Sequence, residues 1–564
     1  MEKIWLKNWP QDLPKEMVYP HGKKPVFEYL RLHAKKNPEK EAIVYYGKHI
    51  SYRELDESSD RFANYLIGKG IKKGDRVGIF MGNCPQYVIA IFGIHKMGGV
   101  VCPISPMFKE LELKYQVNDS ELSCLVTLDI YMPIVNNIKK DIPTVKSIVV
   151  TNYNDYLPAE PVMPLVEYMK IPRQNDAFIG VDDFMEVLKT ADSTPPTVDI
   201  DMDNDISILE YTGGTTGLPK GAMLTHHANL FKPTGMARVR ELNENSVEIT
   251  CMPFFNIAGM TCMVGIVIFG GTNVLITQFD PLSALIAADR YKATSMYTAV
   301  PAFVQMIHHP DARKYDLSSF KIALATSFVI SLNEKIAQQW SDLTDGCLLL
   351  EAAYGLSETH TADTFMPRQM VKYGSVGIPT FETEVKILDL NDKTKEVSIG
   401  EQGEIAIKNP GCMKGYWKKK EATEDTLVDG FVLTGDIGKV DEDGFLWWLG
   451  RFKEMIKVSG FSVFPEEVEA LLNQHPAIME SAVIPVPDVR KGEVVKAFVV
   501  LRPEQKGIIE PDEIITWARK NMTPHKVPAY VEFREQLPKS GVKLLRRILR
   551  DEENEKRKAD EQIS

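Results

Sequence analysis

Short apolar runs alternate with longer amphipathic stretches through the first half of the chain. Residues 76–81 are predicted to form a buried strand, residues 85–97 a helix and residues 99–104 a second strand. A strand, a helix and a strand joined by short links indicate a βαβ unit and a parallel sheet. Further strands are expected between helical stretches, at residues 124–128, 147–151, 273–279, 294–298 and 321–325.

Two segments depart from this alternation. Residues 155–203 are rich in proline and aspartate, which predicts a long surface connection or an insertion. Residues 261–276 form the most apolar stretch, but Gly265, Gly270 and Gly271 interrupt it. A membrane-spanning helix needs about 20 consecutive apolar residues. The stretch is therefore predicted to be a buried helix followed by a strand.

The pattern changes twice in the last third of the chain. Shorter strands are expected at 384–389, 404–408 and 445–449, which indicates a β-rich subdomain. From residue 451 the pattern is typical of a small α+β domain. It has predicted helices at 465–473 and 511–521, predicted strands at 482–486 and 494–501, and a mostly charged tail at 551–564 that is expected to be a frayed helix end.

The composition is that of an ordinary globular protein with several structural units. The chain has 564 residues, of which 44% are hydrophobic and 25% are charged. Its formal net charge of −11 argues against a nucleic-acid-binding protein, which would normally show a basic face. The seven cysteines lack the spacing of a zinc site, so we expect buried, reduced thiols. No signal peptide is expected, and the protein is predicted to be cytoplasmic, with peripheral membrane contact left open.

The strongest local motif is Tyr-Thr-Gly-Gly-Thr-Thr-Gly-Leu-Pro-Lys-Gly at residues 211–221. Its glycines let the backbone close around phosphate oxygens, its threonines add hydroxyl donors, and Lys220 adds a cation. It does not satisfy G-x-x-x-x-G-K-[ST], because Gly221 follows the lysine. We predict a phosphate-binding loop, since a plain surface turn does not need this density of donors. The adjacent His226 and His227 are expected at a helix start or in the core, because neighbours do not share a helix face.

Residues 211–226 resemble the signature of the adenylate-forming superfamily, which includes acyl-CoA synthetases, firefly-luciferase-like enzymes and peptide-synthetase adenylation domains. The resemblance continues along nearly the whole chain and is strongest to long- or medium-chain fatty acid–CoA ligases. It implies an α/β fold with a large N-terminal domain at residues 1–450, built from layered α/β sheets and a β-rich subdomain. A small, mobile α+β domain at residues 451–564 would carry the catalytic lysine and the CoA step.

The resemblance implies a nucleotide site assembled from several motifs. The residues expected to bind ATP or AMP are Thr212, Gly213, Gly214, Thr215, Thr216, Gly217, Lys220, Tyr354, Gly355, Ser357, Glu358, Thr359, Asp436 and Arg451. In the superfamily the tyrosine of Tyr-Gly-Leu-Ser-Glu-Thr stacks on adenine. The glutamate of that motif binds Mg²⁺, here with Thr212, and a carboxylate with phosphate oxygens suits this hard cation. The aspartate of Thr-Gly-Asp and the later arginine reach the ribose.

The resemblance also assigns roles in the C-terminal part. Lys543 is the catalytic lysine, although Val542 replaces the usual glycine before it and the loop is one residue shorter. Lys457 acts in one of the two conformations, and Lys453 is the hinge between the domains. The residues expected to approach CoA are Ser459, Gly460 and Phe461.

Four residues are expected to line the acyl-substrate site: Asn256, Thr326, Ser327 and Phe328. Asn256 stands where the superfamily usually has a histidine near the substrate carboxylate, and asparagine can form a hydrogen bond there but cannot carry a charge. At residues 325–331 many relatives have a small turn, whereas this chain has the bulkier Phe328 and Val329.

The sequence therefore predicts an AMP-forming acyl-CoA ligase, an acid–thiol ligase that uses ATP, Mg²⁺ and CoA. It would convert a medium- or long-chain fatty acid to an acyl-adenylate and then to a thioester. Three alternatives stay open: a ligase for aryl acids of the coumarate type, an adenylating enzyme that serves a carrier protein, and a catalytically silent nucleotide-binding relative. Small molecules rather than nucleic acids are the expected partners.

Overall fold

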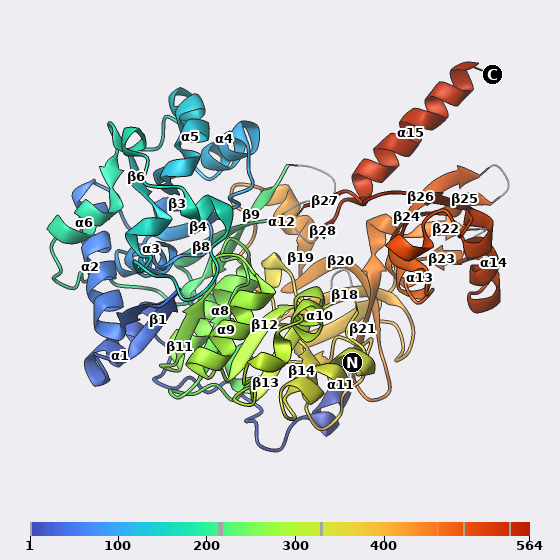
Figure 1. Ribbon diagram of the computed structural model, residues 1–564, viewed down its shortest axis with the longest axis horizontal. Helices are drawn as coiled ribbons and strands as arrows, with labels where there is room; N and C mark the ends of the chain where they lie inside the picture. The colour runs from blue at the N-terminus through green and yellow to red at the C-terminus, as the bar shows by residue number, and fades with distance from the viewer. Residues whose placement is uncertain are drawn as a thin grey trace.

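The computed structural model describes residues 3–212, 218–327, 331–458, 461–488, 491–540 and 543–563. These residues form a large N-terminal α/β domain and a small α+β domain at the C-terminal end (Figure 1). The predicted fold class is therefore confirmed. The exact boundary at residues 450 and 451 stays a prediction.

One seven-stranded sheet has the order β7-β6-β5-β3-β4-β8-β9 and is parallel except for the β8–β9 hairpin. The βαβ unit predicted at 76–104 is confirmed, because α3 (Pro85–Lys96) joins β3 to a parallel β4. The strands are β3 (Arg76–Phe80), β4 (Val100–Ile104), β5 (Leu122–Leu128), β6 (Ser147–Thr151), β7 (Asp182–Asp183), β8 (Ile206–Thr212) and β9 (Lys220–Thr225).

Successive residues of β3 face two helical layers. Val77 and Ile79 pack into the main core, whereas Phe80 packs into a second cluster on the opposite face. The second cluster includes residues of α4 (Glu110–Asp119) and α5 (Met132–Ile138). The main core includes residues of α3 and of two further helices, α1 (Val26–Lys36) and α2 (Tyr52–Gly68). Both faces of the sheet are thus covered, as expected for parallel strands.

A second seven-stranded sheet has the order β14-β13-β12-β10-β11-β1-β2. The buried helix and strand predicted at 261–276 are confirmed as α8 and β11, and α7 begins at His226 as expected. The strands are β1 (Glu41–Tyr45), β2 (Lys48–Ser51), β10 (Val247–Thr250), β11 (Thr272–Leu275), β12 (Ser295–Ala299), β13 (Ile322–Thr326) and β14 (Leu348–Glu351). The associated helices are α7 (His226–Val239), α8 (Ile257–Ile268), α9 (Pro281–Tyr291), α10 (Val300–Ile307) and α11 (Glu334–Leu343).

The predicted β-rich subdomain is an antiparallel five-stranded sheet, in which β20 is central. Its elements are β17 (Glu384–Leu388), β18 (Gly403–Lys408), α12 (Lys420–Thr426), β19 (Leu427–Val428), β20 (Phe431–Val440) and β21 (Leu446–Arg451). A short pair, β15 (Thr364–Phe365) and β16 (Ile378–Pro379), precedes it. The sequence did not predict β20, because Gly435 and Gly438 interrupt its apolar pattern.

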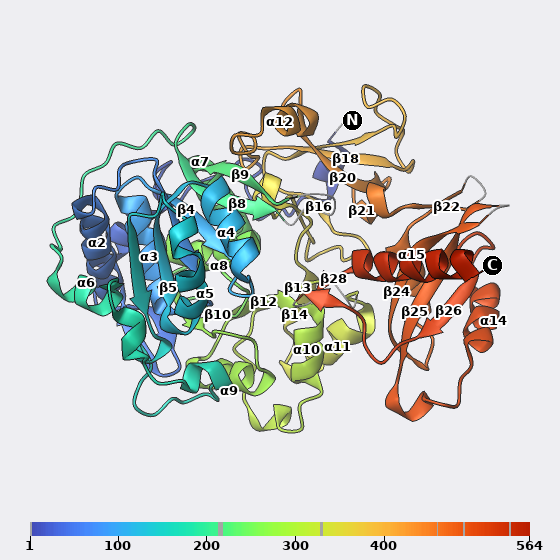
Figure 2. The same ribbon diagram turned by 90° about the horizontal axis from the view of Figure 1, so that it is seen from above.

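The small domain contains the predicted helices α13 and α14 and the predicted long strands β24 and β25. Its elements are β22 (Ile456–Val458), β23 (Phe461–Val463), α13 (Pro465–Leu472), β24 (Ile478–Asp488), β25 (Gly492–Leu501), α14 (Pro511–Asn521), β26 (Tyr530–Phe533), β27 (Lys539–Ser540), β28 (Lys543–Leu544) and α15 (Arg546–Ile563). Figures 1 and 2 both show the β27–β28 hairpin extending from this domain toward the large one.

Two predictions of irregular structure need correction. The connection predicted at 155–203 contains β7 and α6 (Phe184–Thr190), and Phe184 is fully buried, so part of it belongs to the packed domain. The tail predicted to be frayed is the continuous helix α15, which lies against β24. Lys496 of β25 anchors it, because its Nζ lies 2.6 Å from a carboxylate oxygen of Glu553.

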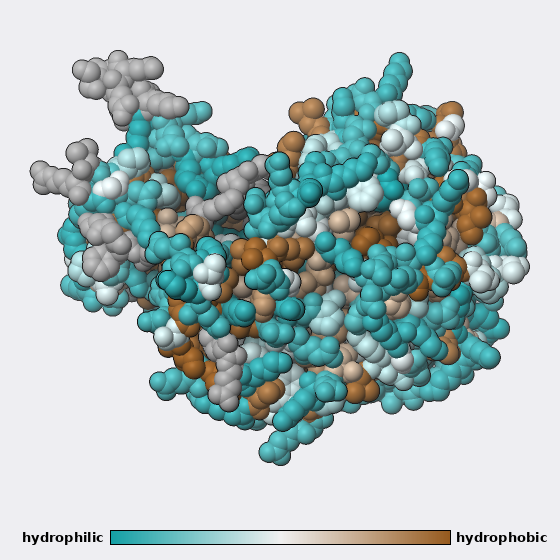
Figure 3. Space-filling view, turned by 180° about the vertical axis from the view of Figure 1, so that it is seen from behind, coloured by the Kyte–Doolittle hydropathy of each residue, from teal (hydrophilic) through white to brown (hydrophobic). Residues whose placement is uncertain are grey.

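The surface and the cysteines are those expected of a globular protein. The face in Figure 3 is mostly hydrophilic, with hydrophobic residues in separate small patches. None of the helices in the described ranges is long and apolar enough to cross a membrane. All seven cysteines are free thiols, and all but Cys412 are buried, as predicted.

Candidate active site

Three predicted nucleotide residues come together at the β-rich subdomain. Tyr354 follows β14, Asp436 lies in β20 and Arg451 ends β21. The Tyr354 hydroxyl donates to Oδ2 of Asp436 at 2.7 Å, and Nε of Arg451 lies 2.7 Å from Oδ1. Strands β20 and β21 pair Asp436 directly with Arg451, so the antiparallel register itself creates the ion pair. The structure thus unites residues that lie far apart in the sequence.

Burial controls the electrostatics of this group. Asp436 is only 2% exposed, and burial raises the pKa of its carboxyl, while the Arg451 guanidinium opposes the rise. Burial also raises the pKa of the Tyr354 phenol, and the neighbouring Asp436 carboxylate adds to that shift. The phenol therefore remains a hydrogen-bond donor at neutral pH.

A second group joins Lys220 to Glu358 through Tyr416. Nζ of Lys220 lies over the Tyr416 ring, 4.5 Å from its centroid. The Tyr416 hydroxyl donates to Oε1 of Glu358 at 2.7 Å. Tyr416 was not predicted to be a site residue, since it lies 58 residues after Glu358 and outside every motif of the sequence. This tyrosine holds the predicted metal-binding carboxylate and the predicted phosphate-binding lysine in one arrangement.

The two groups lie near each other. The charge on Glu358 contributes to the pKa shifts of both Asp436 and Arg451, which places the three side chains within electrostatic reach. Thr212 ends β8 and pairs with Lys220 of β9 in register. Both strands lie beside the short helix η8 (Ser357–Thr359), which carries Glu358. Gly213, Gly214, Thr215, Thr216 and Gly217, which connect the two strands, lie outside the described residues.

The loop after Tyr354 is tightly folded. A Cβ atom on Gly355 would lie 2.6 Å from the Cα of Thr361, so only glycine fits without a backbone shift. Ser357 and Thr359 form the ends of η8, and Thr359 is fully buried. Thr359 therefore supports the loop from inside, and its contact with a nucleotide stays a prediction.

The predicted acyl-side residues lie at the carboxyl ends of the parallel strands in the second sheet. Asn256 precedes α8 and is exposed, while Thr326 ends β13. Ser327 follows it and donates its hydroxyl to Oε2 of Glu351 at 2.5 Å. Ligands of open α/β sheets bind at this edge. Phe328 lies outside the described residues.

Two buried carboxyls near the site were not predicted. Burial raises the pKa of Glu351 to about 7, and two hydrogen bonds from Ser327 oppose this rise. Burial raises the pKa of Glu210 to about 8; a backbone bond from Ile257 opposes this rise, and the Glu358 charge reinforces it. Glu351 ends β14 and Glu210 lies two residues before the end of β8, in positions where the sequence showed only a single acid after an apolar run.

The C-terminal residues are only partly described. Lys453 lies in the turn η9 (Phe452–Glu454) between β21 and β22, and Lys543 begins β28. The side chains of Lys453, Phe461 and Lys543 lie outside the described set, and so do residues Ser459 and Gly460 entirely. Lys457 of β22 is exposed, and its backbone N–H donates to Glu493 at 2.7 Å.

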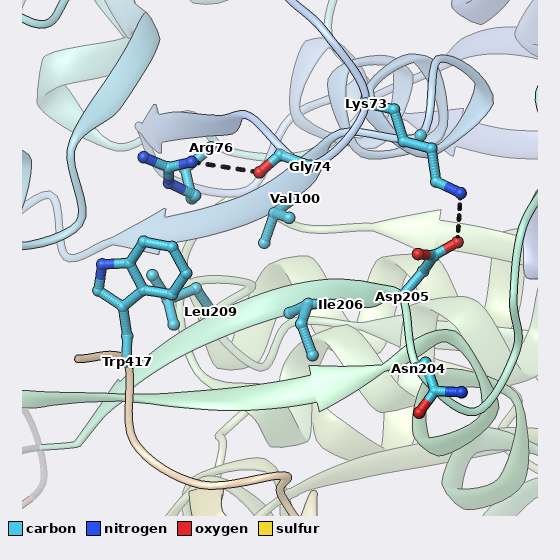
Figure 4. A pocket seen from close by; sticks show the side chains of 10 residues that line it. Lys73, Gly74, Arg76, Val100, Asn204, Asp205, Ile206, Leu209 and Trp417 are labelled. Carbon is cyan, nitrogen blue, oxygen red and sulfur yellow. Dashed lines mark hydrogen bonds and ion pairs between the residues drawn. The ribbon is translucent and has the colours of Figure 1, made fainter. Parts of the chain in front are cut away.

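A surface cavity of about 210 Å³ has Leu209 and Trp417 in its wall, next in sequence to Glu210 and Tyr416 (Figure 4). Lys73 and Asp205 form an ion pair of 2.6 Å in its wall, and the Arg76 guanidinium lies over the Trp417 ring. None of the predicted site residues in the described ranges lines it. Because these charged groups of its wall already have partners, we do not assign it to the active site.

The oxygen atoms at the site suit Mg²⁺ better than a transition metal. Glu358 and Thr212 offer a carboxylate and a hydroxyl, and Mg²⁺ commonly takes one or two carboxylates together with substrate phosphates. Among the residues that the structure describes there is no group of three or more His, Cys, Asp or Glu side chains that could hold a metal alone.

Comparison with known proteins identifies the family. The model of the AMP-binding enzyme family matches residues 30–417, and that of the AMP-binding enzyme C-terminal domain matches residues 467–543. The chain is 37% identical to a long-chain-fatty-acid–CoA ligase of Bacillus subtilis strain 168, over 98% of this chain and 99% of the relative. It is 32% identical to a feruloyl-CoA synthase of an Amycolatopsis species, over 90% and 94%.

Comparison with a solved structure supports the same family. The o-succinylbenzoate CoA synthetase MenE from Bacillus subtilis, in complex with ATP and a magnesium ion, superimposes with a TM-score of 0.77 at 25% identity. The match covers 93% of this chain and 99% of MenE. The resemblance to the adenylate-forming superfamily is thereby confirmed, and the chain belongs to the AMP-binding enzyme family.

Proposed function

We propose that the chain is an AMP-forming acyl-CoA ligase that activates medium- or long-chain fatty acids. The observation that carries the proposal is the joining of the Tyr354–Asp436–Arg451 group and the Lys220–Tyr416–Glu358 group in one site. Full-length identity of 37% to a long-chain-fatty-acid–CoA ligase supports the acid class. Use of ATP and CoA follows from this family and this reaction.

In the first step the carboxylate of the acid attacks the α-phosphorus of ATP, and pyrophosphate leaves. Tyr354 would lie against adenine, and Asp436 would accept hydrogen bonds from the ribose hydroxyls. Lys220 and residues 212–217 would hold the β- and γ-phosphates. Glu358 and Thr212 would hold Mg²⁺, which offsets phosphate charge when bound. Lys543 would stabilise the charge that develops on the α-phosphate oxygens.

In the second step the CoA thiol, as its thiolate, attacks the acyl carbonyl carbon and AMP leaves. This step needs a different set of residues at the same place. We propose that the small domain turns about Lys453, which withdraws Lys543 and brings Lys457, Ser459, Gly460 and Phe461 toward the site. Its support is the position of Lys453 in η9, which links the last strand of the β-rich sheet to the first strand of the small domain.

The acid would lie between α8 and β13. Asn256 would hydrogen-bond the carboxylate, while Thr326, Ser327 and Phe328 would border the acyl group. Glu351 supports this wall, because its carboxyl accepts both the backbone N–H and the hydroxyl of Ser327.

An aryl acid is the second candidate substrate class. The observation that favours it is the 32% identity to a feruloyl-CoA synthase over most of both chains. A planar aryl acid needs a flat, rigid pocket, whereas a fatty acid needs a long apolar channel, so the two classes separate cleanly by activity.

Pyrophosphate release across a panel of acids tests the proposal. Acetate, octanoate, palmitate, benzoate, coumarate and ferulate would each be supplied with ATP and Mg²⁺, with and without CoA. We expect octanoate or palmitate to give the highest kcat/KM and an acyl-CoA product only when CoA is present. Lys543→Ala should lower the rate of the adenylation step by about 10²–10³-fold. Preference for ferulate would support the aryl class, and pyrophosphate release without a thioester would contradict the ligase.

A further inference from the structure

A buried ion pair lies directly behind the loop that carries Tyr354 and Glu358. Nζ of Lys232, in α7, lies 2.6 Å from Oδ1 of Asp363, at the end of that loop. The side chains of the two residues are 1% and 0% exposed. Burying two opposite charges costs desolvation free energy that an apolar pair of similar volume would avoid. Filling the space is therefore a poor explanation of the pair.

Asp363 has further partners, two within the same loop and one after β18. The Thr359 hydroxyl donates to Oδ2, and Nδ2 of Asn409 donates to Oδ1 at 2.8 Å. The backbone N–H of Asp363 donates to the carbonyl oxygen of Tyr354 at 2.7 Å. Asp363 thus connects the end of the loop to its first residue, Tyr354, and to Thr359, which follows Glu358.

The loop needs such an anchor because its backbone is strained. His360, Thr361 and Ala362 have φ values of 57°, 56° and 48°, so three successive residues other than glycine are left-handed. A residue other than glycine in this conformation is strained and persists only when its surroundings hold it. Lys232 supplies one of these contacts, since its Nζ also donates to the carbonyl oxygen of Ala362 at 3.3 Å.

The segment 409–413 connects Lys232 and Asp363 to the backbone of Glu358. Asn409 accepts the backbone N–H of Gly411 at 2.8 Å, and a Cβ atom on Gly411 would lie 2.3 Å from Cε of Lys232. Two residues later, the Met413 N–H donates to the carbonyl oxygen of Glu358 at 2.8 Å. Lys232 therefore packs against both segments that fix the Glu358 backbone.

We infer that the Lys232–Asp363 pair positions Glu358 and Tyr354 for binding of the metal–nucleotide complex. It connects α7, which follows the phosphate-loop hairpin, to the loop that carries the adenine and metal residues. This inference rests on the proposed assignment of Glu358 to Mg²⁺. Lys232 and Asp363 are positioning residues, since both are buried behind the loop and act through it.

The test removes both charges together, so that no unpaired charge stays buried. In Lys232→Met/Asp363→Asn we expect the half-saturating Mg²⁺ concentration and the KM for ATP to rise about tenfold, as for loss of a partner that orients a metal ligand. The Kd of ATP with Mg²⁺, measured by titration calorimetry without any acid, should rise to a similar extent. The KM for the fatty acid should change less than about twofold, because the contacts of the pair lead to the nucleotide loop.

The matched control is Arg240→Met/Glu248→Gln. Arg240 and Glu248 form another buried pair, with side chains 0% and 1% exposed. Arg240 donates to Glu248 and to the carbonyl oxygen of Met236, which lies in α7 and not in the 354–363 loop. This variant should lower the melting temperature while leaving the Mg²⁺ requirement unchanged. If both double variants lose stability and neither changes the Mg²⁺ requirement, the pair is only structural and the inference is overturned.

Two more variants complete the design. Glu358→Gln tests the assignment of Glu358 to Mg²⁺ separately from the role of the Lys232–Asp363 pair. An unchanged Mg²⁺ requirement in this variant would contradict the assignment. A raised requirement would support it, and the double variant then tests the pair alone. Asn409→Ala removes the hydrogen bond to Asp363 and the acceptor of the Gly411 N–H but keeps the ion pair, so it should fold even if the double variant does not. A severalfold rise in the Mg²⁺ requirement supports the inference, and no rise contradicts it.

Discussion

Asp436 shows how single residues of this site are held in advance of the substrate. Its carboxyl group is buried, with the Arg451 guanidinium beside one oxygen and the Tyr354 hydroxyl donating to the other. A buried charge is tolerated when it is paired and hydrogen-bonded. A ribose hydroxyl that reaches this carboxylate would find an acceptor with a fixed orientation, which reduces the entropy that is lost when the reacting groups are aligned.

Tyr416 is expected to matter through its hydroxyl and through its ring. Tyr416→Phe keeps the ring under Lys220 but removes the hydrogen bond to Glu358, so kcat/KM for ATP should fall about tenfold, as for one bond to a charged group. Tyr416→Leu removes both contacts and should lose more. Steady-state kinetics with varied ATP measures this, and equal activity of Tyr416→Phe and wild-type protein would contradict a role for the hydroxyl.

Glu351 should make stability depend on pH. Burial raises its pKa from 4.5 to about 7, so the folded protein holds a proton that the unfolded chain has lost. Stability from this group is present below about pH 4.5 and is lost as the pH rises through about 7, in total about 3 kcal/mol. Chemical denaturation of Glu351→Gln from pH 5 to 8 should therefore show a smaller decline than wild type. Parallel declines would contradict the shifted pKa.

The site residues found from sequence share one property, which is membership of a compact motif. Tyr354 and Glu358 lie four positions apart, and Lys220 closes a glycine-rich run. Tyr416 and Glu351 were missed because their roles depend on tertiary contacts. Tyr416 reaches Glu358 across the chain, and Glu351 meets Ser327 only because β13 and β14 are neighbouring strands. No local pattern records such a contact.

At the scale of elements, the 354–363 loop depends on a close backbone approach. A Cβ atom on Gly355 would lie 2.6 Å from the Cα of Thr361 and 2.7 Å from the backbone nitrogen of Ala362, and neither backbone atom can rotate away. Gly355→Ala should therefore cost about 1–3 kcal/mol of stability and raise the KM for ATP. Thermal unfolding and ATP-dependent kinetics measure the two effects.

Gly68→Ala is the control for that variant. Gly68 ends α2, and beyond its chain neighbours and its own helix backbone no atom lies within 4 Å of the position that a Cβ would take. Alanine should therefore be neutral there or stabilising by about 0.4–1 kcal/mol. Equal effects of the two substitutions would show that the close approach at Gly355 does not matter.

The elements predicted correctly are those with strong local patterns. The β3–α3–β4 unit and the α8–β11 pair follow from apolar runs bounded by glycine or proline. The central strand β20 was missed because two glycines interrupt it, and its pairing with β18 and β21 decides its structure. The helix α15 was underestimated because its sequence is mostly charged, and its order comes from Leu549 and from the Lys496–Glu553 ion pair.

At the scale of the whole molecule, one arginine connects the segment of the proposed hinge to the β27–β28 hairpin. Arg546 follows β28 and contacts three carboxylates: Glu454 beside the hinge at 2.5 Å, Glu466 at 2.8 Å and Glu469 at 2.6 Å. Burial raises the pKa of Glu466 to about 8, and the Arg546 charge opposes that rise. A rotation at Lys453 would therefore move the hairpin with Lys543 as a rigid body.

Arg546→Met should destabilise the small domain selectively. It leaves the buried carboxylates without their cation, and breaking a buried pair costs about 3–5 kcal/mol. Calorimetry should show a lower transition for the small domain and an unchanged one for the large domain. The neighbouring Arg547 is exposed, so Arg547→Met should change neither transition. A single transition that falls equally in both variants would contradict the role of Arg546.

The acyl-adenylate is the species on which the whole account depends. The most direct measurement incubates the protein with palmitate, ATP and Mg²⁺ without CoA, stops the reaction with acid and analyses the products by mass spectrometry. The account predicts palmitoyl-AMP and pyrophosphate in amounts close to that of the enzyme, followed by conversion to palmitoyl-CoA and AMP when CoA is added. ADP and phosphate in their place, or no adenylate with palmitate or any other acid tested, would contradict it.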